Sequence, residues 1–206
     1  VFTFQMWILR ASDRVVVIDT GVGNGKQRVA SSQHMLNTPS LDWLRAIGAG
    51  PDDVTDVVMT HLHGDHVGWN THWANGRWVP TFPKARYHLP IGDWESYGQR
   101  IARGALPQVF AAPMIDSVIP IVEAGLARFI RGGDEVAGLV AHDAPGHTPG
   151  SLFLSLDHRG EEFLFSGDIM HSPIQVLEPG INSRWCEFQD DARASRLKVL
   201  KRAAAK

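Results

Sequence analysis

A six-residue segment about a third of the way along the chain restricts the fold most strongly. Residues 61–66 read His-Leu-His-Gly-Asp-His and directly follow residues 56–60, an apolar run that predicts a short buried strand. Side chains two apart on a strand point to the same side, so His61 and His63 can reach one metal ion. The glycine that follows permits a sharp bend, which turns the last two residues of the segment toward a second ion. The segment therefore predicts half of a metal site at the end of a rigid strand.

Length, composition and charge limit what the chain can do. It has 206 residues, of which 44% are hydrophobic and 20% charged, so we predict a single domain over residues 1–206. The formal net charge is −2 without a basic stripe, which argues against a nucleic-acid partner. Cys186 is the only cysteine, which excludes an intrachain disulfide and a thiolate-rich zinc site. No apolar run approaches the roughly 20 residues of a membrane span. We expect a cytoplasmic protein that acts on a small molecule, and a homodimer is compatible with the sequence.

Both ends of the chain resemble cut ends. The chain begins at Val1, without an initiator Met and inside a strand-like pattern. A helix-like pattern starts at Asp190 and runs to Lys206 without a Gly or Pro terminator. We therefore expect a fragment of a longer domain, truncated at both ends.

The chain between these ends holds strand-like runs in two groups. The predicted strands cover residues 2–9, 15–18, 56–60, 86–89, 138–144, 151–156 and 162–165. Residues 91–130 between the groups are predicted to be mostly helical, and a helical spacing over 39–47 places Trp43 at a core position. Residues 69–84 predict an aromatic loop or short hairpin. Two groups of strands separated by helices, with polar residues at strand ends, indicate a layered α/β domain.

Three further motifs follow strand-like runs. Asp19 ends the first group's hairpin in Ile-Asp-Thr-Gly, His147 lies within Pro-Gly-His-Thr-Pro-Gly, and Asp168 ends Ser-Gly-Asp. Together with residues 61–66, these motifs make the chain similar to the metallo-β-lactamase-fold hydrolases over nearly its whole length. The resemblance implies a four-layer αββα sandwich in the α/β class.

The resemblance also implies a site. Two divalent ions, Zn²⁺ by expectation, would be held by a set of six ligands: His61, His63, Asp65, His66, His147 and Asp168. Asp168 would bridge the two ions, Asp19 would orient a ligand imidazole, and Asp65, Asp168 and His171 would be the catalytic residues. The family's last histidine ligand, some tens of residues beyond the bridging Asp, has no counterpart before Lys206.

Some side chains keep two interpretations. His171 either contacts substrate or shuttles a proton beside the bridging carboxylate, or is a loop histidine bonded to backbone. Trp69 and Trp73 either line the substrate site or pack in the core. The five histidines outside the motifs are predicted to be surface or structural residues: His34, His72, His88, His142 and His158.

The function that the resemblance implies is hydrolysis by a metal-activated hydroxide of an ester, lactone or related bond. Residues 67–70 and 80–87 favour the lactonase and organophosphate-hydrolase-like branch. A thioester hydrolase of the glyoxalase II type and a mononuclear-iron dioxygenase are the alternative enzymes. A metal-stabilised domain without catalytic activity is the alternative from another class.

Overall fold

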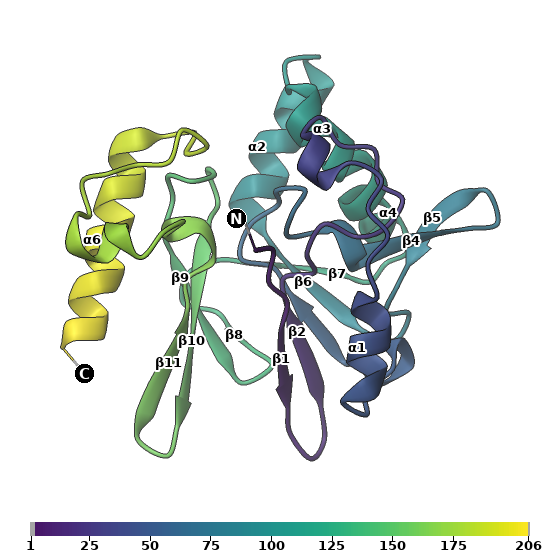
Figure 1. Cartoon of the computed structure of the whole chain (residues 1–206), viewed down its shortest axis with the longest axis horizontal. Coiled ribbons are helices and arrows are strands. Elements are labelled where there is room, and N and C mark those ends of the chain that lie inside the picture. The colour runs from purple at the N-terminus through teal and green to yellow at the C-terminus, as the bar shows by residue number, and fades with distance from the viewer. Residues whose placement is uncertain (1–2, 206) are drawn as a thin grey trace. The chain divides into compact units, whose positions relative to one another are not determined.

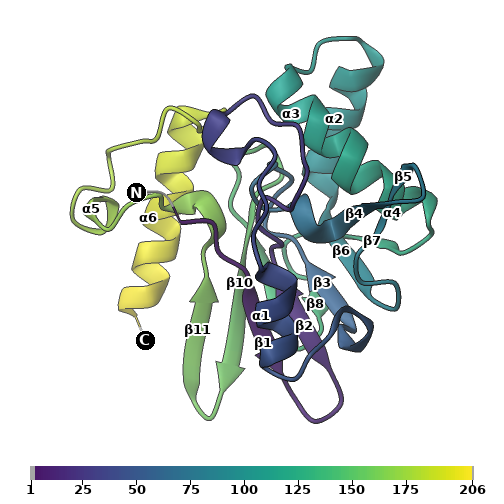
Figure 2. The ribbon, with the colours of Figure 1, turned by 45° about the vertical axis from the view of Figure 1, so that its right-hand side comes forward.

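A computed structural model describes residues 3–205, which form two compact units. Unit 1 comprises residues 3–89 and 97–128, and unit 2 comprises residues 90–96 and 129–205. Figure 1 labels most of the elements, and Figure 2 also labels β3 and α5. The class is mixed α/β, as the sequence predicts.

The largest sheet has the strand order β1-β2-β3-β6-β7. Its strands are β1 Trp7–Arg10, β2 Val15–Ile18, β3 Asp56–Val58, β6 Arg86–Pro90 and β7 Ala127–Ile130. β1 and β2 form the predicted antiparallel hairpin, whereas β2, β3 and β6 run parallel. Every residue of β2 and β3 is buried. Central parallel strands are covered on both faces, which is why these two strands read as continuous apolar runs.

Helices and a hairpin complete unit 1. The helices are α1 Ser40–Ala46, α2 Ile91–Ala102, whose first residues belong to unit 2, α3 Gln108–Pro113 and α4 Ile119–Glu123, with a π-helical turn over Met114–Val118. β4 Thr71–Ala74 and β5 Arg77–Pro80 form an antiparallel hairpin within the predicted aromatic segment, and Figure 2 shows it beside α4.

The four-stranded sheet of unit 2 has the order β11-β10-β9-β8. Its strands are β8 Glu135–Val136, β9 Leu139–Asp143, β10 Leu152–His158 and β11 Glu161–Phe165, followed by α5 Ile174–Leu177 and α6 Gln189–Ala204. Val199 of α6 packs with Phe153 and Ile169 in a buried cluster. Arg202 reinforces this packing with a 2.6 Å ion pair to Glu162 of β11. These contacts hold α6 against the sheet.

Three expectations need correction or fall outside the structure. Trp43 is 64% exposed rather than in the core, because the buried residue of α1 is Leu44. The end of the predicted helical middle, Ala127–Ile130, is a strand. Phe2 of the first predicted strand lies outside the described residues, and β1 begins only at Trp7. Among residues 3–205, no helix combines the length and the apolar character needed to cross a bilayer.

Candidate metal centre

Three imidazoles lie together in unit 1, directly after β3. The ring centroids of His61 and His63 are 4.8 Å apart, and those of His61 and His66 are 4.0 Å apart. His61 and His63 are buried, with exposed fractions of 1% and 7%. The Met59 N–H donates to the His88 carbonyl over 3.0 Å, which extends the β3–β6 pairing to the edge of the cluster. The strand therefore holds the imidazoles rigidly.

A buried carboxylate fixes the protonation of two of these rings. Asp19, 4% exposed, accepts hydrogen bonds from the Thr60 N–H at Oδ1 and from the Thr60 hydroxyl at Oδ2, both over 2.8 Å. Since a carboxylate only accepts, His66 Nδ1, 2.8 Å from Oδ2, donates as well. The Thr60 hydroxyl has given its single proton to Asp19, so it accepts from His61 Nδ1 over 3.0 Å. Both rings thus carry a proton on Nδ1, and coordination falls to Nε2.

Asp65 lies in the tight turn between these histidines. The N–H groups of His66 and Val67 both donate to the His63 carbonyl, over 3.0 and 3.2 Å. The His66 carbonyl accepts from the Thr20 N–H over 2.5 Å and from its hydroxyl over 2.9 Å. Asp65 is half-buried on the same turn as two of the imidazoles. The bend predicted at the glycine after His63 therefore exists and is tied to the loop that carries Asp19.

An aromatic stack supports His63 from the helical side of unit 1. The Phe110 ring lies parallel to the His63 ring, with centroids 4.9 Å apart and an interplanar angle of 14°. Tyr97 stacks on Phe110 in turn, at 5.9 Å. The π-helical turn after α3 is anchored by a bidentate pair in which Arg28 donates to Asp116 over 2.6 and 3.0 Å. No sequence pattern indicates this support, because its partners are separated by up to 88 residues.

A fully buried lysine completes that anchor. Lys26 Nζ donates to the Thr71 hydroxyl over 2.6 Å and to the Asp116 carbonyl over 3.1 Å. Its ammonium also lies 3.5 Å from the centroid of the Trp78 ring. Burial lowers the pKa of Lys26 to about 7, and the nearby Asp116 carboxylate opposes that shift only in part. The network is therefore sensitive to pH near neutrality.

His147 lies in unit 2 on a turn that is clamped from one side by Asp93. Gly146 has a φ of +134°, a conformation that favours glycine, and His147 is 3% exposed. Asp93, fully buried, accepts from the Thr148 hydroxyl over 2.9 Å and from the Gly150 N–H over 2.6 Å. The predicted tight turn thus owes its shape to a carboxylate that precedes it by more than 50 residues.

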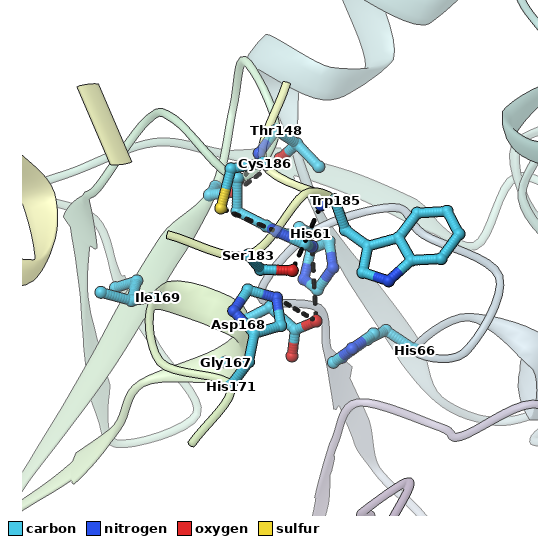
Figure 3. A network of polar contacts seen from close by, with 12 residues as sticks. His61, His66, Thr148, Gly167, Asp168, Ile169, His171, Ser183, Trp185 and Cys186 are labelled. Carbon is cyan, nitrogen blue, oxygen red and sulfur yellow. Dashed lines mark hydrogen bonds and ion pairs between the residues drawn. The ribbon is translucent and has the colours of Figure 1, made fainter. Parts of the chain in front are cut away.

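Asp168 meets two histidines within unit 2. Its Oδ2 lies 3.3 Å from His147 Nε2 and 3.3 Å from His171 Nε2. Figure 3 shows Asp168 and His171 facing each other, joined by a dashed line. The side chains of Asp168 and His171 are 24% and 19% exposed, so this edge of unit 2 can be reached from solvent. Of the two interpretations of His171, its position favours a role beside the carboxylate.

Cys186 is a neighbour of this group that sequence reasoning missed. Its Sγ lies 3.8 Å from Nδ1 of His147, the ring nitrogen opposite to the one that faces Asp168. Burial raises the pKa of the Cys186 thiol. A lone cysteine on a loop far from any motif carries no signal in the sequence, and only the folding of that loop against the His147 turn brings it close.

The donors in each unit fit a divalent metal ion. Imidazole nitrogens with fixed tautomers and carboxylate oxygens are the ligands that Zn²⁺, Fe²⁺, Mn²⁺ and Co²⁺ accept in proteins. The predicted ligands are divided between the units: His61, His63, Asp65 and His66 in unit 1, His147 and Asp168 in unit 2. Within each unit they are neighbours, as the order of the motifs implies.

Two of the five histidines outside the motifs, His88 and His142, lie in structural settings. His88 Nε2 is 2.8 Å from an Asp56 carboxylate oxygen, and His142 Nε2 is 2.8 Å from the Ser155 hydroxyl. Burial lowers the pKa of His142. Trp69 and Trp73 differ: the former is buried and the latter is 59% exposed, with its ring 5.1 Å from that of Trp78.

Comparison with known proteins shows which family shares these motifs. The profile of the Metallo-beta-lactamase superfamily matches residues 5–206. The chain belongs to this superfamily. Its relatives include the N-acyl homoserine lactonase AiiB of Agrobacterium fabrum, 30% identical in an alignment of 106 positions that covers 44% of this chain and 38% of the relative. An acyl-coenzyme A thioesterase of Gallus gallus is 29% identical over 184 residues, covering 81% of this chain and 57% of the relative.

Solved structures give the same fold. The crystal structure of the hydrolase AbOPH of the beta lactamase superfamily matches with a TM-score of 0.77 and 25% identity, covering 93% of this chain and 65% of that one. The metallo-β-lactamase fold predicted from the motifs is therefore confirmed. This chain spans less than two thirds of the length of each of these three proteins.

Proposed function

We propose that the chain is the metal-binding part of a hydrolase that cleaves an ester, lactone or related bond of a small molecule. Two divalent ions, Zn²⁺ in the first instance, would be held by the six predicted ligands: His61, His63, Asp65, His66, His147 and Asp168. Such ions, when bound, make hydroxide available near neutral pH and polarise the bond to be cleaved.

The observation that carries this proposal is the hydrogen-bond chain from Asp19 through Thr60 to His61 and His66. It leaves the Nε2 atoms of two adjacent imidazoles as the coordinating atoms, with the protons held on the far side of each ring. A histidine cluster that served only packing would not need one carboxylate to set two tautomers. Outer carboxylates of this kind raise the basicity of ligand histidines and fix their orientation.

The residues of unit 2 would complete the chemistry. Asp168, which faces Nε2 of both His147 and His171, would bridge the ions and hold the reacting water in place. His171, the more exposed of the two histidines, would contact substrate or carry a proton from it. Asp65, on the turn between His63 and His66, would ligate the second ion.

The substrate class follows from the relatives only as a proposal. AiiB is named as an N-acyl homoserine lactonase, and the relative from Gallus gallus as an acyl-coenzyme A thioesterase. A lactone is our first candidate, and a thioester is the second, since the thioesterase alignment covers 81% of this chain. Both reactions attack an acyl carbonyl and would use the same site residues.

The proposal is tested by metal content and hydrolysis of a lactone, a thioester and a phosphotriester by the full-length protein. Asp168→Ala should abolish hydrolysis and lower metal content while the circular dichroism spectrum stays that of the wild type. Asp157→Ala, an exposed carboxylate at the end of β10, is the matched control and should change neither. Wild-type protein with less than one bound metal per chain, or full activity in Asp168→Ala, would contradict the proposal.

A further inference from the structure

Unit 2 holds a group of three metal-ligating side chains that the proposed hydrolysis does not use as a set. One ligand atom each of His147, His171 and Cys186 lies within 4.8 Å of the other two. The three come from the turn around His147, the segment after Asp168 and the loop before α6, and Figure 3 labels His171 and Cys186. His147 and Cys186 are almost fully buried, with exposed fractions of 3% and 5%.

The spacing of Cys186 and His147 suits two ligands of one ion. With zinc–sulfur and zinc–nitrogen bonds of about 2.3 and about 2.0 Å, a tetrahedral angle places the two ligand atoms roughly 3.5 Å apart. The observed separation of Cys186 Sγ and His147 Nδ1 is 3.8 Å. The observed separation of these two atoms is therefore only a few tenths of an ångström longer than the separation expected for two ligands of one zinc ion.

Paired backbone segments keep these two side chains at that distance. The Glu187 N–H donates to the His147 carbonyl over 3.1 Å, and the Phe188 N–H donates to the Gly146 carbonyl over 2.8 Å. The segment that carries Cys186 is therefore bonded along the turn that carries His147. Ligands on such a fixed frame are held ready for an ion rather than collected by it.

His171 can supply the third ligand with a small side-chain movement. Within the described part of the chain, neither of its ring nitrogens makes a hydrogen bond, and its Nε2 is 3.3 Å from Asp168 Oδ2. Since the three ligand atoms already lie within 4.8 Å of one another, each needs to approach the others by little more than about 1 Å to reach tetrahedral spacing. That movement breaks no hydrogen bond of the ring.

We propose that His147, His171 and Cys186 form a further metal site, selective for thiophilic divalent ions such as Cd²⁺ and Zn²⁺, that uses Nδ1 of His147. Thiolate ligands favour soft metal ions, whereas the imidazole and carboxylate ligands of the hydrolytic centre do not favour soft ions over harder ones. The existence of this site does not depend on the proposed hydrolysis.

Its consequence for the hydrolytic centre rests on the proposed function. A neutral imidazole has one lone pair, so His147 can bind a metal through Nδ1 or through Nε2, but not through both. An ion held by Cys186 would withdraw His147 from Asp168, and the site would be inhibitory.

The test is a titration of the metal-free chain with Cd²⁺, followed in the near ultraviolet. We expect a sulfur-to-cadmium charge-transfer band that saturates at one ion per chain, and Cys186 is the only cysteine that can give rise to it. Cys186→Ser should lose the band, and His147→Ala and His171→Ala should each weaken Cd²⁺ binding at least about tenfold. Asp168→Asn, which removes the carboxylate but none of the three ligands, is the control and should keep the band.

Two outcomes would overturn the site. One is a wild-type chain without the band at saturating Cd²⁺. The other is a band whose affinity is unchanged in both histidine variants, which would indicate a lone thiol. A band in a protein that hydrolyses nothing would reject the proposed function and leave the site standing. Equal inhibition of hydrolysis by Cd²⁺ in the wild type and Cys186→Ser would reject the inhibitory role.

Discussion

Replacing Asp19 by Asn tests whether the charge and the two accepting oxygens of one carboxylate support two ligand histidines. Asp19 Oδ2 accepts from the Thr60 hydroxyl and from His66 Nδ1, and Oδ1 accepts from the Thr60 N–H. An amide has one accepting oxygen, so whichever way it faces, its NH₂ group meets at least one donor. Asn is also the right replacement for the backbone, because Asp19 has a φ of +52°, which Asn adopts more readily than Ala.

The magnitude follows from the number of hydrogen bonds lost. If the amide oxygen replaces Oδ2, one charge-assisted bond is lost, at about 2 kcal/mol; in the opposite orientation two are lost, at about 4 kcal/mol. We expect the free energy of unfolding of metal-free Asp19→Asn to fall within that range. The affinity for Zn²⁺ should fall about 10- to 100-fold, because a neutral amide no longer raises the basicity of His61 and His66 and, in the second orientation, no longer sets their protonation either.

Urea unfolding of the metal-free chain and competition with a chromophoric chelator measure the two quantities. Asp13→Asn is the matched control, since the Asp13 side chain is 64% exposed and, among residues 3–205, pairs only with its neighbour Arg14. It should change neither quantity. If Asp19→Asn binds Zn²⁺ within about threefold of the wild type, the Asp19 carboxylate does not support the ligand histidines and this reasoning is wrong.

Two further perturbations examine the support of the site in unit 1. Burial lowers the pKa of Lys26 in the folded chain to about 7. Between about pH 7 and about pH 10, the unfolded chain therefore holds a proton that the folded chain lacks. The free energy of unfolding should rise with pH over this range, by up to about 1.4 kcal/mol per pH unit. Lys26→Met should flatten that rise in urea unfolding curves, and equal slopes in the two proteins would contradict the low pKa. Phe110→Ala removes the ring stacked on His63 at 4.9 Å and should cost about 2 kcal/mol of stability and about tenfold in Zn²⁺ affinity. Phe110→Leu keeps most of the volume, so it should recover the stability but not the affinity; recovery of both would assign Phe110 to packing alone.

Much of the fold was predictable because its signals are local. The β1–β2 hairpin, the buried strand before His61 and the strands on either side of His147 follow from runs of apolar residues bounded by turn residues. The prediction for Trp43 failed, since helical spacing shows which positions share a face but not which face meets the core. The strand Ala127–Ile130 was hidden in a segment with helical neighbours.

The candidate ligands, and the prediction that they form a metal site, came from the sequence alone. His61, His63 and His66 fall on one strand end and one turn, and such short-range geometry is fixed by spacing and by the bend at Gly64. The positions of Asp19, His147 and Asp168 after strand-like runs also follow from local patterns.

The groups that support those ligands come from residues far apart in the chain, and they are known from the tertiary structure alone. Asp93 reaches the turn of His147, Asp116 anchors the segment behind Phe110, and Cys186 faces Nδ1 of His147 across 39 residues of chain. None of these contacts leaves a periodic or spaced signal, because they arise where separately formed segments pack and a buried polar group must find a partner. The sequence thus names the candidate ligands of the hydrolytic centre, and the packing brings in Cys186 and sets how the histidine rings are protonated and supported.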